Sequence, residues 1–338
     1  MTETEHLPKV TAPLPWHAGA WSSLHQQIEQ GQTPHALLLV GPEHTGKSRL
    51  AMALARLLLC ARPESGLNCG QCHPCELLAA GSHGDFRWLA PEEKSRVIKI
   101  EQIRQLVEFT NRTAGFGQRK LVVLAPAESM NPNAANALLK SLEEPAADTY
   151  LILVCHRLQG LPATIRSRCQ MLRLALPARE QSLQWLDQVT GDRSRSAMLL
   201  DLAQGRPMLA EQLQITDGFE HLETVHRALR QLFTGQTNVS ALVLLLADER
   251  LDRLLALMIA ELQGILRELD PARLCSPQAR TAFRLLDELL GAQAAINAGS
   301  NPNRQLFMES LFAKIQRELG EVWLGDSIQA NRGAFIHE

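Results

Sequence analysis

The fold-determining stretch of this chain is residues 35–48, HALLLVGPEHTGKS. Residues 35–40 form the apolar run of a buried strand, and residues 41–48 match the GxxxxGKS pattern of a phosphate-binding loop. In this pattern the glycines let main-chain N–H groups surround phosphate oxygens, the lysine reaches the outer phosphates and the serine hydroxyl ligates magnesium. A helix expected over residues 48–60 adds its positive N-terminal end.

The loop therefore predicts a site for ATP with Mg²⁺. Its predicted protein ligands are Gly41, Thr45, Gly46, Lys47 and Ser48. The strand before the loop and the helix after it supply the context that the motif requires. The alternative is a fortuitous match to the pattern in a glycine-containing turn.

A later buried strand does not end in the acids that hydrolysis needs. Residues 120–124, KLVVL, are typical of a strand covered on both faces of a parallel sheet. In a working nucleoside triphosphatase, this strand ends in an aspartate for magnesium and often a glutamate that activates water. Here Ala125 and Pro126 occupy those places, and Glu128 is a nearby alternative acid. We therefore expect a chain that binds nucleotide without hydrolysing it.

Strand and helix patterns alternate from residue 35 to residue 174. Further strands are predicted over 85–89, 150–154 and 171–174, and helices over 100–113 and 131–143. Pro145 ends the second helix because proline disfavours helix in the residue before it. This alternation indicates an α/β domain over residues 1–174, with a parallel sheet and flanking helices.

Composition indicates helical domains after the sheet. The chain has 338 residues, which predicts two or three domains, and it is 45% apolar but only 4% aromatic. Leucine and alanine dominate the last third, as is typical of aliphatic helix packing. We expect a small helical domain over residues 175–212 and an all-α domain over 213–338. Within the latter, residues 241–266 are predicted to form one long helix with Ser240 as its N-cap.

Charge and hydropathy narrow the functional classes. The net charge of −2 argues against a dedicated nucleic-acid binder, so any DNA contact would come from a local patch or a larger assembly. No stretch is long and apolar enough for a membrane span, and residues 1–6 lack the basic and apolar regions of a signal peptide. We therefore expect a soluble, cytoplasmic protein without a membrane partner.

Four of the seven cysteines are spaced as metal ligands: Cys60, Cys69, Cys72 and Cys75. Tight CxxC turns let thiolates chelate one tetrahedral ion, so the spacing predicts a structural Zn²⁺ site without an open position for water. An iron–sulfur cluster and free or redox-active cysteines are the alternatives. The remaining cysteines are expected to be buried or partly buried: Cys155, Cys169 and Cys275.

Several motifs together resemble the clamp-loader branch of the AAA+ superfamily. They are the phosphate loop, the four-cysteine insert, the run NALLKSLEEP over residues 136–145 and the triplet Ser167-Arg168-Cys169. Within that branch, Pro15-Trp16, the run HALL over 35–38 and the missing acids are similar to the delta prime family rather than to the tau/gamma motor subunits. The resemblance spans nearly all of residues 16–170, whereas the C-terminal half shares only helical character and length.

The resemblance implies roles for individual residues. Arg168 is implied to be an arginine finger that acts in trans on the nucleotide of a neighbouring motor subunit, a task that suits its planar, permanently charged guanidinium. A plain ion pair with Glu143 or Glu144 is the alternative. Met208 occupies the place of the motor subunits' sensor arginine.

The resemblance also implies an assembly. Residues 1–174 would be the AAA+ nucleotide-binding domain with its zinc insert at 60–75, residues 175–212 its lid and residues 213–338 a collar. The collar would join the tau/gamma motor subunits and the delta subunit in a hetero-oligomeric ring of the DNA polymerase III holoenzyme, which acts on the sliding clamp and primed DNA. The chain alone is expected to be inactive. An autonomous or motor-type ATPase and a zinc-dependent DNA-binding module are the competing functional hypotheses.

Overall fold

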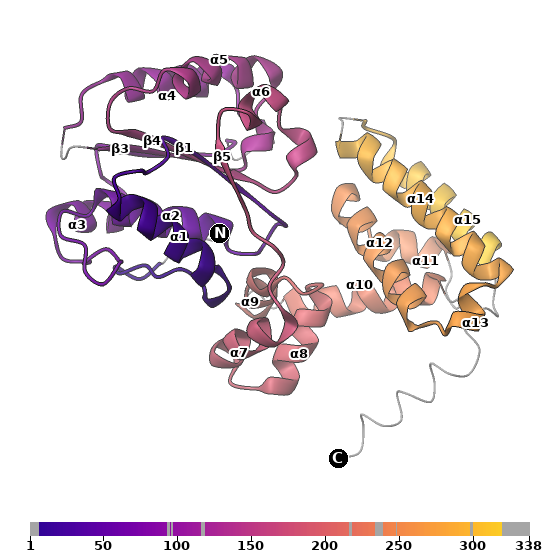
Figure 1. Cartoon of the computed structure of the whole chain (residues 1–338). Helices are drawn as coiled ribbons and strands as arrows, with labels where there is room; N and C mark the ends of the chain where they lie inside the picture. Colours follow the sequence, from indigo (N-terminus) through magenta and orange to yellow (C-terminus); the bar gives the residue numbers. More distant parts are fainter. Residues whose placement is uncertain are drawn as a thin grey trace. The chain divides into compact units, whose positions relative to one another are not determined.

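The computed structural model describes the chain as two compact units, residues 1–212 and residues 213–338. Figure 1 labels their helices and strands. The described residues are 7–92, 95, 97–115, 119–215, 218–233, 239–247, 249–297 and 300–319. The prediction that residues 1–6 are not part of a signal peptide therefore concerns residues outside the described ones.

The first unit is built on a five-stranded parallel sheet. Its strands are β1 (Ala36–Val40), β2 (Phe86–Leu89), β3 (Lys120–Leu124), β4 (Thr149–Cys155) and β5 (Gln170–Arg173). Their spatial order is β2-β3-β4-β1-β5. Leu38 of β1 pairs with Leu153 of β4 on one side and with Met171 of β5 on the other. The phosphate loop therefore begins at the carboxyl end of an interior strand, between the ends of β4 and β5.

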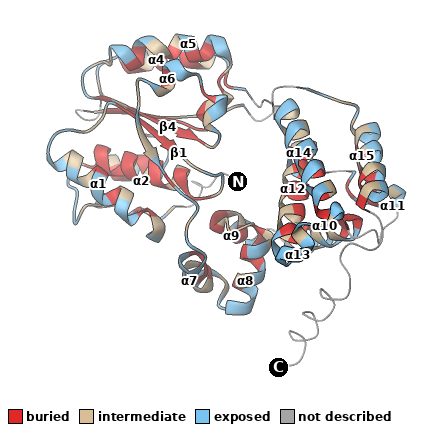
Figure 2. Cartoon of the chain, turned by 45° about the vertical axis from the view of Figure 1, so that its right-hand side comes forward, coloured by how far each residue is buried: buried red, intermediate tan, exposed pale blue. Residues whose placement is uncertain are grey.

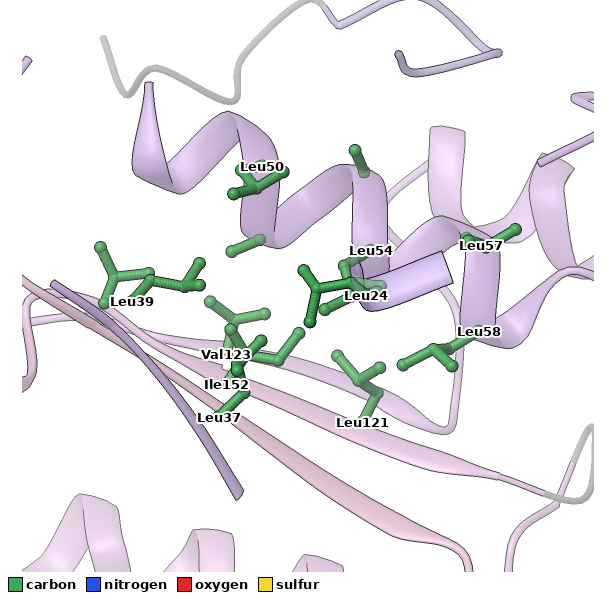
Figure 3. Close-up of a cluster of buried hydrophobic side chains, with 14 of the residues drawn as sticks. Leu24, Leu37, Leu39, Leu50, Leu54, Leu57, Leu58, Leu121, Val123 and Ile152 are labelled. Carbon is green, nitrogen blue, oxygen red and sulfur yellow. The ribbon is translucent and has the colours of Figure 1, made fainter. Parts of the chain in front are cut away.

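Helices cover both faces of this sheet (Figure 1). On one face are α1 (Ala18–Glu29), α2 (Lys47–Leu59) and α3 (His73–Ala79), and on the other are α4 (Ile100–Asn111), α5 (Pro132–Glu143) and α6 (Ala163–Arg166). Side chains alternate along β1, so Leu37 and Leu39 face α2 while Leu38 enters the core against α5. Figure 3 shows Leu50 and Leu54 of α2 over the first of these cores. The predicted α/β sheet with flanking helices is confirmed.

Short helices and a helical cluster complete the first unit. Three 3₁₀ helices are η1 (Pro15–His17), η2 (Ala127–Ser129) and η3 (Leu158–Gly160), and three α-helices follow β5: α7 (Arg179–Thr190), α8 (Arg193–Leu202) and α9 (Pro207–Ile215). α7 and α8 pack against each other. Asp192 caps α8 by accepting from the N–H of Ser194 at 2.8 Å.

The second unit is helical over its described residues. Its helices are α10 (Gly218–Phe233), α11 (Val239–Leu245), α12 (Leu251–Glu268), α13 (Pro271–Leu274), α14 (Pro277–Asn297) and α15 (Arg304–Leu319). α12 packs against α10 and α14. On α15 the buried residues Met308, Phe312, Ile315 and Leu319 recur at helical spacing, and Figure 2 shows buried residues in red. Among the described helices, none combines the length and the apolar character of a membrane span.

Residues 241–266 do not form the single helix that the sequence predicted. α11 already begins at Val239, before the predicted N-cap Ser240, and it ends at Leu245. A turn then intervenes, and α12 begins at Leu251. The prediction of one continuous helix and the prediction of Ser240 as its N-cap are therefore both wrong.

Contacts from distant residues stabilise this turn. Arg304, at the start of α15, donates to the main-chain carbonyl of Leu246 at 2.9 Å and also to that of Glu249. The Glu249 side chain is buried, and its carboxylate lies 2.7 Å from Nε2 of His221 on α10. These partners satisfy the groups that end α11, which the local apolar pattern could not reveal.

Candidate functional site

Two glycines of the phosphate loop are required by their surroundings. Gly46 immediately precedes α2 and has a φ of 80°, a left-handed conformation that favours glycine. A Cβ on Gly46 would lie 2.1 Å from Cδ1 of Leu14, and a Cβ on Gly41 would lie 2.0 Å from the carbonyl oxygen of Leu174. Neither glycine can carry a side chain unless its neighbour moves.

The other predicted nucleotide ligands lie in the same loop. Thr45 and Lys47 are buried, with only 1% of Lys47 exposed. The Thr45 hydroxyl donates to the Pro42 carbonyl at 2.9 Å, and Nζ of Lys47 donates to the same oxygen. Ser48 follows in the first turn of α2, a helix of 13 residues whose N-terminal end favours an anion. The structure therefore brings together all five residues that the motif singles out.

The phosphate loop is covered by residues 8–17, which we call the N-terminal segment. Within it, Leu14 and His17 are buried. The indole Nε1 of Trp16 donates to the Thr45 carbonyl at 2.9 Å. The Trp16 ring also meets Trp185 of α7 edge to face, with ring centroids 5.5 Å apart. The N-terminal segment thus connects the loop to the helical cluster after β5.

A buried histidine, His17, and a partly buried one, His156, flank Lys47, and neither was among the predicted site residues. Burial, and secondly the positive charge of Lys47, lowers the pKa of His17 to about 4 and that of His156 to about 4. Both rings are therefore neutral at pH 7. His156 could have been suspected, because it directly follows β4 and the carboxyl ends of parallel strands share one edge. His17 comes from the N-terminal segment, and no local pattern indicates its position.

Glu128 has a structural partner after β4. Its carboxylate accepts from the main-chain N–H of His156 at 3.0 Å and from that of Arg157 at 3.1 Å. Both oxygens take part, since Oε2 lies 3.2 Å from the His156 nitrogen. Glu128 therefore ties η2 to the segment that follows β4. At the end of β3 itself, Ala125 is buried and Pro126 follows it.

Met208, which the resemblance places at the sensor position, has an apolar side chain. Gly205 has a φ of 75° and leads through Arg206 into α9, whose second residue is Met208. The side chain of Met208 is buried, and its main-chain N–H donates to the carbonyl of His44 in the phosphate loop at 3.2 Å. Met208 thus contacts the loop through its backbone, whereas its thioether supplies no positive charge.

Arg168 lies between α6 and β5, and its partner is Glu143 at the end of α5. Nε of Arg168 donates to Glu143 Oε1 at 2.8 Å, and Nη2 contacts the same oxygen. Nη1 donates to the carbonyl of Thr164 on α6 at 2.9 Å. About a third of the Arg168 side chain, 33%, stays exposed. The ion pair that the sequence left as an alternative is thus present, on a side chain that solvent still reaches.

The four predicted metal ligands form one buried cluster. The sulfurs of Cys60, Cys69, Cys72 and Cys75 all lie within 4.8 Å of one another. Cys60 Sγ is 3.6 Å from Cys69 Sγ and 3.8 Å from Cys72 Sγ. Tetrahedral zinc with Zn–S bonds of about 2.3 Å places its sulfurs about 3.8 Å apart. A disulfide would require sulfurs about 2.05 Å apart, so the described spacing fits a metal site instead.

Main-chain donors support thiolates in this cluster. The N–H of Cys72 donates to Cys69 Sγ at 3.3 Å, and the N–H of Cys69 donates to Cys60 Sγ at 3.3 Å. N–H donors from Gln71 and Cys72 lower the pKa of Cys69 to about 6, whereas burial raises the pKa of Cys60 to about 12. A bound cation would offset the burial cost by stabilising each thiolate. The cluster could therefore hold a metal ion.

Asn68 joins the cysteine cluster to the N-terminal segment. Only 2% of Asn68 is exposed. Its Nδ2 donates to Cys75 Sγ at 3.5 Å and to the Lys9 carbonyl at 2.7 Å, and its Oδ1 accepts from the Thr11 N–H at 3.0 Å. Arg56 of α2 donates to the Thr11 hydroxyl from the other side. The same segment thus contacts both the cysteine cluster and the phosphate loop.

The remaining cysteines differ in exposure. Cys155 is buried and Cys169 is partly buried, as expected, and burial raises their pKa values to about 12 and about 11. Cys275 is exposed, so the expectation of burial is wrong for this residue. It follows the short helix α13, where few side chains surround it.

Part of this chain is similar in sequence to known proteins. The DNA polymerase III subunit delta' (delta prime) of Pseudomonas aeruginosa is 43% identical over 230 residues, which cover 68% of this chain and 69% of that relative. This chain belongs to the DNA polymerase III delta prime family. The delta prime subunit of Escherichia coli is 36% identical over 216 residues, or 64% of this chain and 65% of that relative. A family model described as DNA polymerase III, delta subunit matches residues 16–178.

A solved structure shares the fold. A DNA polymerase III gamma subunit-related protein from Thermotoga maritima aligns with a TM-score of 0.54 and 18% identity, covering 89% of this chain and 99% of that one. The resemblance to the delta prime family that the motifs indicated is therefore confirmed.

Proposed function

We propose that this chain is a clamp-loader subunit of the DNA polymerase III holoenzyme in DNA replication, which binds ATP with Mg²⁺ without hydrolysing it. The observation that carries the proposal is a complete phosphate loop beside a strand without acids. Lys47 and Ser48 are in place, whereas β3 ends in Ala125 and Pro126. Membership of the delta prime family supports the clamp-loader role.

Glu128 and Met208 support a hydrolytically silent site. The carboxylate of Glu128 already accepts main-chain N–H groups on both oxygens. Met208 supplies no charge at the sensor position. A motor-type ATPase needs a magnesium carboxylate, a base and usually a sensor cation, and the described residues around the loop do not present this set.

Arg168 is proposed to act on a neighbouring motor subunit as an arginine finger. Its partial exposure at the surface of the first unit supports this role, because the guanidinium can meet a phosphate of another chain. The planar donors suit the charge that develops on a transferring phosphoryl group.

The four-cysteine cluster is proposed to bind a structural Zn²⁺. Sulfur spacing and four thiolate donors fit a closed tetrahedral site. When bound, zinc would neutralise the buried thiolates and cross-link the insert, and the cysteines themselves would fix the start of α3 against the end of α2.

The proposed partners are the tau/gamma motor subunits and the delta subunit in a cytoplasmic ring, with the sliding clamp and primed DNA reached through the assembly. The collar role is supported by the helical character of the described part of the second unit and by membership of the delta prime family. The candidate contact residues of the collar are the exposed apolar side chains Leu244, Leu245, Phe283, Leu290 and Leu306.

The test is ATP turnover by a reconstituted loader, stimulated by clamp and primed DNA. Arg168→Ala is expected to lower turnover at the adjacent motor site steeply, since arginine fingers contribute on the order of 10³ to 10⁵ in rate in well-studied systems. Arg166→Ala, two residues away, is the matched control. Unchanged turnover with Arg168→Ala in an intact assembly would remove the finger from the proposal.

A further inference from the structure

The first observation is that Glu143 holds the guanidinium of Arg168 by one edge. Nε and Nη2 of Arg168 both contact Glu143 Oε1. Nη1 donates to the Thr164 carbonyl at 2.9 Å and lies 3.4 Å from the Ser167 hydroxyl. A guanidinium carries five N–H donors in a rigid planar fork. Because Glu143 takes the side edge of the fork, the end edge, with one N–H from each Nη, can face phosphate oxygens.

Glu143 lies at the C-terminal end of its helix, α5. Glu143 is the last residue of α5, where a negative charge opposes the helix dipole. Pro145 follows two residues later and prevents α5 from continuing. A carboxylate at this point therefore weakens the helix unless a cation compensates it, and Arg168 is that cation. The position of Glu143 is therefore better explained by its contact with Arg168 than by a contribution to the stability of α5.

The third observation is the exposure of the pair. The side chains are 33% exposed for Arg168 and 47% exposed for Glu143. Exposed ion pairs are weak, and this one leaves the guanidinium at the surface. Its contacts nevertheless limit the rotamers that Arg168 adopts. An arginine that is already oriented loses less rotational freedom when it meets its target.

We propose that Glu143 is a positioning residue for Arg168. It holds Nε and Nη2 on the subunit's own surface so that the end edge of the guanidinium points toward a nucleotide phosphate of the neighbouring subunit. This inference rests on the proposed function of Arg168. It predicts that Glu143 acts on turnover only through Arg168 and not on nucleotide binding by the motor subunit.

The experiment is a double-mutant cycle in the reconstituted loader, with kcat and KM for ATP measured at saturating clamp and primed DNA. Glu143→Ala is expected to lower kcat about five- to tenfold and to leave KM unchanged. Glu143→Gln keeps an acceptor for Nε and is expected to lower kcat only about two- to threefold. Glu144→Ala, at the adjacent residue, is the matched control and is expected to match wild type.

The deciding comparison is Glu143→Ala in the Arg168→Ala background, where no further loss is expected. An equal loss in both backgrounds, a rise in KM, or wild-type kcat for Glu143→Ala would overturn the positioning role. If Arg168→Ala itself leaves kcat unchanged, the proposed function fails together with this inference. If Arg168→Ala lowers kcat and Glu143→Ala does not, only the inference fails. Gel filtration confirms assembly of each variant, and Glu143→Gln serves if Glu143→Ala does not assemble.

Discussion

Substitution of Asn68 by alanine should weaken both the first unit and its proposed metal site. Asn68 connects three groups that are otherwise separate: the sulfur of Cys75, the carbonyl of Lys9 and the N–H of Thr11. Alanine makes none of these hydrogen bonds. The Thr11 residue is 1% exposed, so water cannot replace the lost acceptor without displacing the N-terminal segment.

The magnitude follows from the groups that lose their partner. An unsatisfied buried donor costs about 1–3 kcal/mol, which applies to the N–H of the buried Thr11, whereas loss of the hydrogen bond to the carbonyl of the exposed Lys9 costs about 1 kcal/mol, so Asn68→Ala should cost about 2–4 kcal/mol. For a unit of about 200 residues, each kcal/mol lowers the melting temperature by about 2–4 °C, so we expect a fall of about 4–16 °C. Loss of the hydrogen bond to Cys75 should weaken metal binding about 10- to 100-fold, as is usual for groups that support metal ligands.

The assay is thermal unfolding of the zinc-loaded protein, together with zinc affinity from competition with a chromophoric chelator. Asn303→Ala is the matched control. Asn303 accepts one exposed hydrogen bond from the N–H of Leu306 in the second unit, so its loss should cost about 1 kcal/mol and leave zinc affinity unchanged. If Asn68→Ala matches wild type in both melting temperature and zinc affinity, the argument that Asn68 joins the cluster to the segment is refuted.

Three further predictions concern the loop, the histidines and the second unit. Lys47→Ala should abolish nucleotide retention through gel filtration while the isolated protein releases no phosphate before or after the change; hydrolysis that Lys47→Ala abolishes would instead favour a motor-type ATPase. His17 and His156 have folded pKa values lowered from 6.5 to about 4, so their contribution to stability is complete above pH 6.5 and is lost as the pH falls toward 4, by up to about 3 kcal/mol per ring. Melting temperatures at pH 7.5, 5.5 and 4.5 check this, and His17→Phe should flatten the profile. Arg304→Ala leaves two main-chain carbonyls of the α11–α12 turn without a donor and should cost about 1–3 kcal/mol in urea unfolding; a loss below about 0.5 kcal/mol would contradict that role.

Features set by local pattern were predictable from the sequence. The phosphate loop needs only its own glycines, the strand before it and the helix after it, and the structure has all three between Ala36 and Leu59. The cysteine cluster was equally predictable, because the short CxxC turns place the sulfurs of Cys69, Cys72 and Cys75 close together and the end of α2 supplies Cys60. In both cases the residues that form the feature are neighbours in the chain.

Features set by distant contacts were not predictable. The roles of His17, Glu128 and Asn68 depend on partners that only the fold brings near, such as Lys47, the segment after β4 and the N-terminal segment. The break between α11 and α12 has the same origin. Its stretch of sequence is rich in helix formers, and it ends a helix because Arg304, far along the chain, satisfies the carbonyls there.

The N-terminal segment also has a consequence for the order in which the chain folds. Its partners are made after it on the ribosome: Leu14 packs on Gly46, the Lys9 carbonyl accepts from Asn68 and the Trp16 ring meets Trp185 edge to face. Trp16 can therefore make its contact with Trp185 only after about half of the protein has emerged. Such contacts close long loops, and loop closure is entropically costly, so they form late. Docking of the N-terminal segment over the phosphate loop should thus indicate that the first unit has folded.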